Sequence, residues 1–394
     1  ALAASVTAWR GHGTFASGVV ARQPVATTPV PPAASAPAEA VAAPRPPAKV
    51  HAFASPPASE PVSRWIGRYE IVALIGTGGI AEVYQARFMG GTLFRRPIAL
   101  KVLQPPFARQ PRVVEHFLGE ARLGSLLDHP NIVQILDFGS AHQDYFIAME
   151  LIDGADLARL IGMSHQLGRP IPVPVALAIL RGICDGLHAA HTLRAGDGSA
   201  LELLHRDVKG ANIFVSRNGV VKIGDFGIAR SDTLANPGGV RGTPGYMAPE
   251  QRLGYAVDRR SDLYGVGAVA YELLAGFSVN LDVALLADKG IAGWPHLESL
   301  SKFRHDISPR LEAIVMQALA YDPRDRFADC AELERALASV TPPRHRAAPI
   351  EIIAGWIESM LGASADSSGA HPGSGWRGDR TGSRSGATRE PIRL

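Results

Sequence analysis

Cysteine is scarce in this chain, which has only two cysteines, Cys184 and Cys330, among its 394 residues. Both lie in apolar segments with helical spacing, and neither has the neighbouring cysteines or histidines that a metal-binding motif requires. The scarcity argues against a disulfide scaffold and against a cysteine-ligated metal site. We therefore expect two core thiols, as in a protein of a reducing compartment.

The sequence also lacks an uninterrupted apolar run of 18 residues, a signal-peptide pattern and a strong charge of either sign. The first absence predicts no transmembrane helix, and the second predicts a cytoplasmic protein. A formal net charge of +3 is too small to indicate nucleic acid as a partner. The chain begins at Ala1 and not at Met, so its true N-terminus stays open.

The two ends of the chain have little that could form a core. Residues 1–64 are dominated by Ala, Pro, Ser and Val, and the final residues by Gly, Ser and Arg. Such segments cannot bury enough apolar surface to offset the entropy of ordering them. We therefore predict a disordered arm over 1–64, a folded domain over 65–340, and a tail over 341–394 with a disordered end.

Within the tail, apolar residues with helical spacing predict a short amphipathic helix at about 349–361. Its apolar stripe is expected to contain Ile350, Ile353, Ile357, Met360 and Leu361, with Trp356 beside it. Docking on the folded domain, binding of a partner and binding to a membrane surface are its three candidate roles. Glu351 and Glu358, which have no lysine nearby, argue against the last.

A β-hairpin is predicted near the middle of the chain. Residues 213–215 and 220–223 are rich in β-branched side chains, and Arg217-Asn218-Gly219 between them indicates a turn. The loop before the first strand and the loop after the second should therefore meet at one end of the hairpin.

Polar side chains stand in both of these loops. Asp207, Lys209 and Asn212 precede the first strand, and Asp225 follows the second. Carboxylate and amide oxygens are ligands that Mg²⁺ prefers, and a lysine beside them suits a polyphosphate. The sequence thus predicts a site for a metal-bound polyphosphate.

These segments resemble the signature of the bacterial-type (eukaryotic-like, Hanks-type) serine/threonine protein kinases. HRDVKGAN at 205–212 resembles their catalytic loop, and DFG at 225–227 resembles their metal-binding triplet. The resemblance implies a bilobal α+β fold. Its small lobe, at about 66–150, would be a five-stranded antiparallel sheet with one main helix, and its larger lobe, at about 153–340, would be mainly helical.

A glycine-rich segment near the start of the domain, Gly76-Thr77-Gly78-Gly79-Ile80-Ala81, fits two classes of phosphate loop. A dinucleotide-binding fold would continue with a helix, whereas residues 83–87 alternate like a strand and a further apolar run ends in Lys101. This order is similar to that of the kinases, although Ala81 replaces their third glycine. Glycines here would let the backbone N–H groups approach phosphates closely.

Lys101 needs an anionic partner because an unpaired ammonium at the end of a buried strand would be costly. The helix predicted over 111–127 offers Glu115 and Glu120, and the spacing of the family selects Glu120. A purely structural ion pair is the alternative interpretation.

Residues 149–157 resemble the hinge between the kinase lobes. The resemblance implies that Met149 is the gatekeeper, that the backbones of Glu150 and Ile152 bond the adenine edge, and that Asp156 reaches the ribose. The implied nucleotide-binding residues are Gly76, Thr77, Gly78, Gly79, Val83, Ala99, Lys101, Met149, Glu150, Ile152, Asp156, Asn212 and Asp225.

The implied catalytic residues are Asp207, Lys209, Lys101 and Glu120, with ATP and Mg²⁺ as cofactors and Mn²⁺ as an alternative metal. Asp207 would accept or orient the proton of the substrate hydroxyl. The metal ligands would be Asn212 and Asp225. Lys209 is typical of the serine/threonine class.

GTPGYMAPE at 242–250 resembles the end of a kinase activation segment, which implies a protein substrate. Arg206 stands beside Asp207, and in such kinases this arginine often pairs with a phosphate on that segment. We therefore expect autophosphorylation at Ser231, Thr233 or Thr243, with self-association as a route to transfer between two copies.

Four residues outside the chemistry also have expected roles. Asp262 should bond the backbone of the catalytic loop, and Arg326 should pair with Glu250 as a structural ion pair. His191 lies on the apolar stripe of a helix predicted over 174–191, and we expect it to be packed there and not catalytic.

Three other functions compete with the kinase interpretation. A pseudokinase scaffold would usually have lost Lys101, Asp207 or Asp225, and all three are present. A metabolite kinase would lack the GTPGYMAPE segment. A dinucleotide-dependent oxidoreductase conflicts with the strand that follows the glycine loop.

Overall fold

The computed structural model describes residues 64–89, 95–226, 245–277 and 297–367. Side chains are described for these residues except Arg95 and the residues after Met360. All of them belong to a unit that runs from Pro61 onward. Three expected features lie outside the described residues. They are the arm, most of the activation segment with Ser231, Thr233 and Thr243, and the end of the tail.

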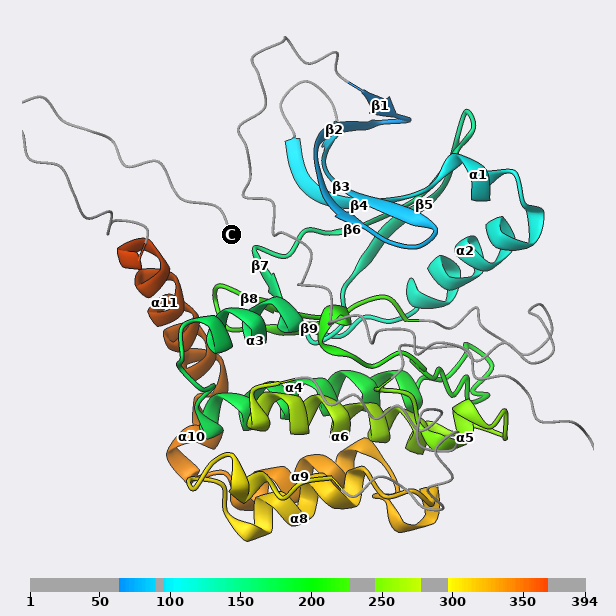
Figure 1. The fold of residues 1–394 in the computed structure, drawn as a ribbon. Helices are drawn as coiled ribbons and strands as arrows, with labels where there is room; N and C mark the ends of the chain where they lie inside the picture. The colour runs from blue at the N-terminus through cyan, green and yellow to red at the C-terminus, as the bar shows by residue number, and fades with distance from the viewer. Residues whose placement is uncertain (1–63, 90–94, 227–244, 278–296, 368–394) are drawn as a thin grey trace, which may run out of the picture. The chain divides into compact units, whose positions relative to one another are not determined.

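The smaller lobe is an antiparallel sheet with the strand order β1-β2-β3-β4-β6-β5 (Figure 1). Its strands are β1 (Trp65–Ile66), β2 (Tyr69–Thr77), β3 (Ala81–Met89), β4 (Arg95–Leu103), β5 (Ile135–Ala141) and β6 (Asp144–Glu150). Five strands were predicted, and the sixth is β1, whose two residues are too few for a period of two to be visible.

One boundary in this sheet differs from what the sequence indicates. The pattern at 132–138 predicts a strand that begins at Ile132, whereas β5 begins at Ile135, because Ile132 forms an isolated parallel bridge with Ile223 of the larger lobe. The N–H of Val133 donates to the carbonyl of Ile223 at 2.8 Å, which ties this segment to the hairpin below the sheet.

The helix of the small lobe is α2 (Pro111–Gly124), which packs against β5 and β6 and follows the short α1 (Pro105–Ala108). Phe117 and Ala121 of α2 are buried in one apolar cluster with Ala81, Leu103 and Ile147 of the sheet. The methyl group of Ala81, which replaces the third glycine of the kinase pattern, is thus part of this core.

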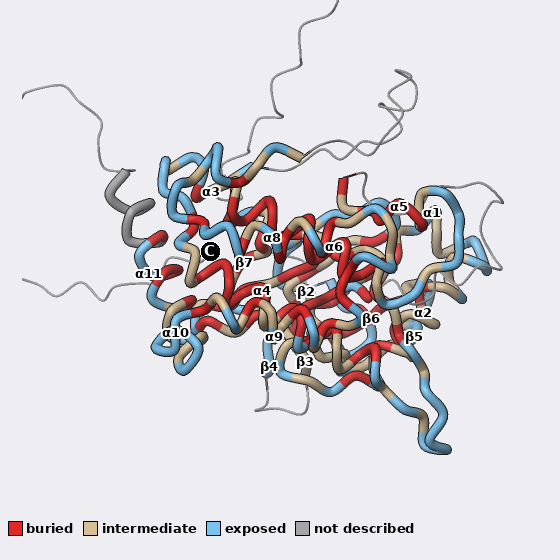
Figure 2. Tube along the Cα trace, turned by 90° about the horizontal axis from the view of Figure 1, so that it is seen from below, coloured by how far each residue is buried: buried red, intermediate tan, exposed pale blue. Residues whose placement is uncertain are grey.

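The larger lobe is built around two buried helices, α4 (Val173–His191) and α6 (Arg259–Ala275), which pack against each other (Figure 2). The other helices among the described residues of this lobe are α3 (Leu157–Gln166), α5 (Pro249–Arg252), α8 (Pro309–Ala318), α9 (Cys330–Val340), α10 (Pro343–Ala347) and α11 (Pro349–Ser367). Nearly all residues of α6 are buried, including Ser261, Asp262 and Glu272, so this helix has no polar face turned to solvent.

A second antiparallel sheet has three strands, in the order β7 (Gly154–Asp156), β8 (Ile213–Ser216) and β9 (Val221–Ile223). β8 and β9 form the predicted hairpin, in which Ile213 pairs with Ile223 and Val215 with Val221. Three short 3₁₀ turns complete the described structure, at Gly210–Asn212, Leu300–Lys302 and Pro323–Asp325.

Among the described residues, α4 alone is long and apolar enough to cross a membrane by length and composition. Arg181 and Asp185 interrupt its apolar residues, so the sequence shows no uninterrupted apolar run at this helix. Within this fold, 61% of the apolar window is buried, as is expected of a core helix.

The helix predicted in the tail is α11, and it docks on the large lobe along α4. Ile353, Trp356, Ile357 and Met360 are buried in the core of that lobe, whereas Ile350 is 49% exposed. The predicted stripe was therefore rotated, since Trp356 belongs to the buried face and Ile350 does not. The side chain of Leu361 lies outside the described residues.

The start of α11 also touches the turn of the β8–β9 hairpin. A Cβ atom at Gly219 would overlap the carbonyl oxygen of Ile350, and Gly219 has a φ of +86°, which favours glycine. Docking on its own domain is thus the role that the fold gives to α11.

Candidate active site

The residues of the catalytic loop converge on the carboxylate of Asp207. Lys209 donates from Nζ to Asp207 Oδ2 at 2.8 Å. Asn212 donates from Nδ2 to the carbonyl oxygen of Asp207 at 2.9 Å and to Oδ2 at 3.2 Å. Two donors therefore fix the carboxylate in one orientation at the surface of the loop.

The hairpin brings Asp225 to the same end of the structure. Asn212 immediately precedes β8 and Asp225 follows β9 after Gly224, whose N–H donates to the carbonyl of Asn212 at 2.9 Å. Asp225 has a φ of 54°, in the left-handed region that side chains rarely adopt. The extended backbone of β9, which ends at Ile223, therefore does not continue through Asp225.

Lys101 of β4 reaches across the lobes to Asp225. Its Nζ lies 2.7 Å from Asp225 Oδ1 and 3.7 Å from Glu120 Oε1 on α2. The Lys101 ammonium holds the pKa of Asp225 below its usual value and outweighs the opposing effect of burial. The structure therefore joins three expected site residues from β4, α2 and the loop after β9.

Other residues expected to contact the nucleotide share one face of the six-stranded sheet of the smaller lobe. The register places Val83 opposite Lys101 and Ala99 opposite Met149, and residues two apart on a strand point to the same side. Gly76 and Thr77 end β2, while Gly78 and Gly79 form the loop to β3. Lys101 and Met149 of this face also line a small cavity, together with Glu120, Asp225, Phe226 and other residues.

Two expected hinge residues use their side chains for structural contacts. Asp156 caps α3, with Oδ1 accepting the N–H of Arg159 at 2.9 Å. The Glu150 carboxylate accepts the N–H of Gln134 at 2.8 Å and pairs with Lys222 of β9 at 2.7 Å. Ile152 lies between these two residues, in the segment after β6. The ion pair of Glu150 was not anticipated from the sequence.

The catalytic loop is anchored from below by Asp262 of α6. Its Oδ2 accepts the N–H of His205 at 2.8 Å, and its Oδ1 accepts the N–H of Arg206 at 2.7 Å. Arg206 has a φ of 64°, so these bonds hold a backbone conformation that is costly by itself. A tilted ring contact adds to the anchor, because the ring centroids of His205 and Phe226 lie 4.7 Å apart.

A second buried anchor joins α5 to the end of the large lobe. Arg326 donates from Nη1 and Nη2 to the two carboxylate oxygens of Glu250 at 2.7 and 2.8 Å. Burial raises the pKa of Glu250, but hydrogen bonds from Arg326 and Ser261 bring it below its ordinary value. Gln251 of the same helix donates to the carbonyl of Arg206 at 3.0 Å, which links α5 to the catalytic loop.

The donor set at this site fits a magnesium ion that is shared with phosphates. Asn212 uses its amide nitrogen for Asp207, which leaves its amide oxygen as a ligand beside the carboxylate of Asp225. Within the described ranges no group of three or more His, Cys, Asp or Glu residues could hold a metal. Mg²⁺ commonly takes one or two protein carboxylates and completes its shell with water and substrate phosphates.

The geometry agrees with comparisons to known proteins. The family model described as "Protein kinase domain" matches residues 69–337. The chain is 37% identical to the tyrosine-protein kinase MasK of Myxococcus xanthus over 273 residues, which cover 68% of this chain and 42% of MasK. It is 35% identical to the serine/threonine-protein kinase PknB of Mycolicibacterium smegmatis over 318 residues, with coverage of 77% and 48%.

Among solved structures, the crystal structure of the PknI kinase domain of Mycobacterium tuberculosis is similar, with a TM-score of 0.53 and 30% identity. The match covers 71% of this chain and 99% of that domain. The chain spans less than half the length of MasK and PknB, so the likeness concerns their kinase domains.

Proposed function

Because this chain belongs to the protein kinase family, we propose that it transfers the γ-phosphoryl group of ATP to serine or threonine hydroxyls of proteins. The observation that carries the proposal is the convergence of the Asp207–Lys209 pair, Asn212 and the Lys101–Asp225–Glu120 cluster. ATP is an intracellular compound, so the proposed activity belongs to the cytoplasm.

Each group has a distinct part in this reaction. The substrate hydroxyl forms a bond to the γ-phosphorus as the bond to ADP breaks, and its proton passes to the carboxylate of Asp207. Lys209, already 2.8 Å from Asp207, places a positive charge beside the transferring group. Lys101, held by Glu120, binds the α- and β-phosphates. Asn212 and Asp225 would hold Mg²⁺ or Mn²⁺, which would neutralise part of the charge of the phosphates.

The choice of hydroxyl rests on Lys209 and on relatives such as PknB, which is named a serine/threonine-protein kinase. MasK is named a tyrosine-protein kinase, so the relatives alone do not decide this point. We further propose that the protein phosphorylates its own activation segment at Ser231 or Thr233, through association of two copies. Arg206, beside the catalytic aspartate, is the cation that would pair with this phosphate.

We expect phosphoserine and phosphothreonine after incubation of the full chain with labelled ATP, Mg²⁺ and generic protein substrates. Hydrolysis of the labelled proteins followed by separation of the phosphoamino acids measures this, and mass spectrometry locates any label on the chain itself. Phosphotyrosine alone would overturn the assignment to serine and threonine. Folded protein that binds ATP without transferring phosphate would contradict the kinase proposal.

The hinge ion pair leads to a prediction about ATP affinity. Replacing Lys222 by methionine removes the partner of Glu150, whose backbone is proposed to bond the adenine edge. We expect the KM for ATP to rise roughly threefold to tenfold, as for the loss of one charge-assisted hydrogen bond, with kcat unchanged. Steady-state kinetics measure both quantities.

Arg217→Met is the matched control for that experiment. Arg217 follows β8 and pairs with Asp153, whose side chain is 86% exposed, so this exposed pair should contribute little. Equal KM values in the two variants and the unmodified protein would contradict the role given to Lys222.

A further inference from the structure

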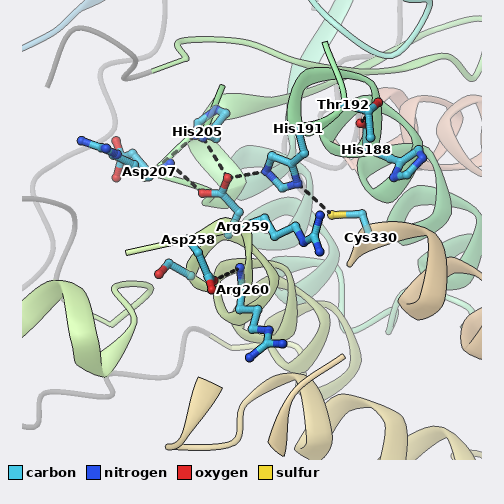
Figure 3. A network of polar contacts seen from close by, with 12 residues as sticks. His188, His191, Thr192, His205, Asp207, Asp258, Arg259, Arg260 and Cys330 are labelled. Atoms are coloured by element: carbon cyan, nitrogen blue, oxygen red, sulfur yellow. Dashed lines mark hydrogen bonds and ion pairs between the residues drawn. The ribbon is translucent and has the colours of Figure 1, made fainter. Parts of the chain in front are cut away.

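A histidine and a cysteine extend the polar network behind the catalytic loop (Figure 3). His191, the last residue of α4, has its Nε2 atom 2.7 Å from Asp262 Oδ2. Cys330, the first residue of α9, has its Sγ atom 3.7 Å from His191 Nδ1. Both side chains are buried, with 5% of His191 and none of Cys330 exposed.

The contacts define where the protons of this network lie. Asp262 accepts the backbone N–H groups of His205 and Arg206, which stabilises its ionised form. A carboxylate only accepts hydrogen bonds, so Nε2 of His191 must carry a proton. Nδ1 of a neutral imidazole is then an acceptor, and the thiol of Cys330 is placed to donate to it. Burial raises the pKa of this thiol and so keeps its proton in place.

Asp262 does not require a charged histidine as its partner. Its oxygens accept the backbone N–H groups of His205 and Arg206, and it stands in the first turn of α6, where the helix dipole favours a negative charge. A charged imidazole would instead direct an N–H toward the thiol sulfur, which is a weak acceptor. The neutral ring satisfies each of these groups.

We propose that Cys330 and His191 are positioning residues of the kinase reaction: the Cys330 thiol holds His191 as the Nε2–H tautomer, and His191 thereby orients Asp262 under the catalytic loop. The relay runs from α9 through α4 and α6 to the backbone of His205 and Arg206. It fixes the segment that carries Asp207. Its kinetic consequence rests on the proposed kinase function, whereas its hydrogen bonds are independent of activity.

Imidazole nitrogen NMR of the ¹⁵N-histidine-labelled full chain tests the tautomer directly. We expect His191, assigned through its own backbone resonances, to be a neutral ring with its proton on Nε2. A proton on Nδ1 alone, or on both nitrogens, would overturn the proposal. This measurement needs no substitution and no catalytic activity.

The positioning role is tested with Cys330→Ala, which removes the donor, and Cys330→Ser, which keeps one. We expect kcat of the alanine variant to fall roughly threefold to tenfold at unchanged KM for ATP, as for one lost hydrogen bond, and the serine variant to recover most of it. The amide protons of His205 and Arg206 should exchange faster in the alanine variant, while those in the middle of α6 keep their protection.

A purely structural role for Cys330 would give a different pattern. Thermal stability would then fall in both variants, while kcat per folded molecule and the exchange of the His205 and Arg206 amides stayed at the levels of the unmodified protein. That pattern would overturn the proposal. If the unmodified protein transfers no phosphate, the proposed function fails, and NMR and amide exchange still decide whether the relay exists.

Discussion

Replacing Asp207 by asparagine is expected to lower kcat by roughly two to four orders of magnitude, the usual contribution of a positioned general base. Asparagine has the same shape but cannot accept the hydroxyl proton. Its amide group also loses the charge that now attracts Lys209, 2.8 Å away. The KM for ATP should change little, since Asp207 contacts Lys209 and Asn212 of its own loop and is not one of the expected nucleotide-binding residues. Single-turnover transfer from labelled ATP measures the effect.

Asp197→Asn is the matched control for this substitution. Asp197 lies in the exposed turn before the catalytic loop, where its carboxylate accepts hydrogen bonds from Ser199 only a short distance along the chain. The control should retain full activity. An Asp207→Asn variant within tenfold of the unmodified protein would show that the chemistry does not pass through this carboxylate.

Replacing Arg326 by methionine is expected to destabilise the domain by about 3 to 5 kcal/mol, because it leaves a buried carboxylate without its partner. The Arg326 side chain has no exposed surface and donates to both oxygens of Glu250. It also donates to the carbonyls of Ala320, Arg260 and Tyr321, which methionine would leave unpaired. Urea unfolding followed by circular dichroism measures the free energy of unfolding.

Arg324→Met is the matched control for Arg326→Met, because Arg324 lies two positions before Arg326 in the chain. The Arg324 side chain is 83% exposed and pairs with Asp322 in solvent, where screening weakens an ion pair. The midpoint of urea unfolding should therefore remain close to that of the unmodified protein. If Arg324→Met and Arg326→Met were equally stable, the buried pair with Glu250 would not be the anchor described above.

The local motifs could be predicted from the sequence because the residues that form each motif lie close together in the chain. Asp207, Lys209 and Asn212 lie within six positions, and the hairpin of β8 and β9 brings them to Asp225 by a short turn. Lys101 at the end of an apolar run indicated an anionic partner, and the structure places Glu120 and Asp225 within ion-pair distance of it.

The errors arose where short segments respond to distant partners. β1 has two residues, and Ile132 leaves the expected strand for a bridge to Ile223, ninety-one positions along the chain. The apolar stripe of α11 was misplaced because helical spacing defines a face only within about one residue, and contact with α4 decides which face is buried.

The sequence by itself therefore determined the kinase family, the candidate residues of the active site and the approximate order of the strands and helices. Only the tertiary structure decided the pairings that no motif indicates: Glu150 with Lys222, and His191 with Asp262 and Cys330. The physical reason is that a hydrogen bond depends on distance and direction between atoms, and packing sets both for residues that are far apart in the chain.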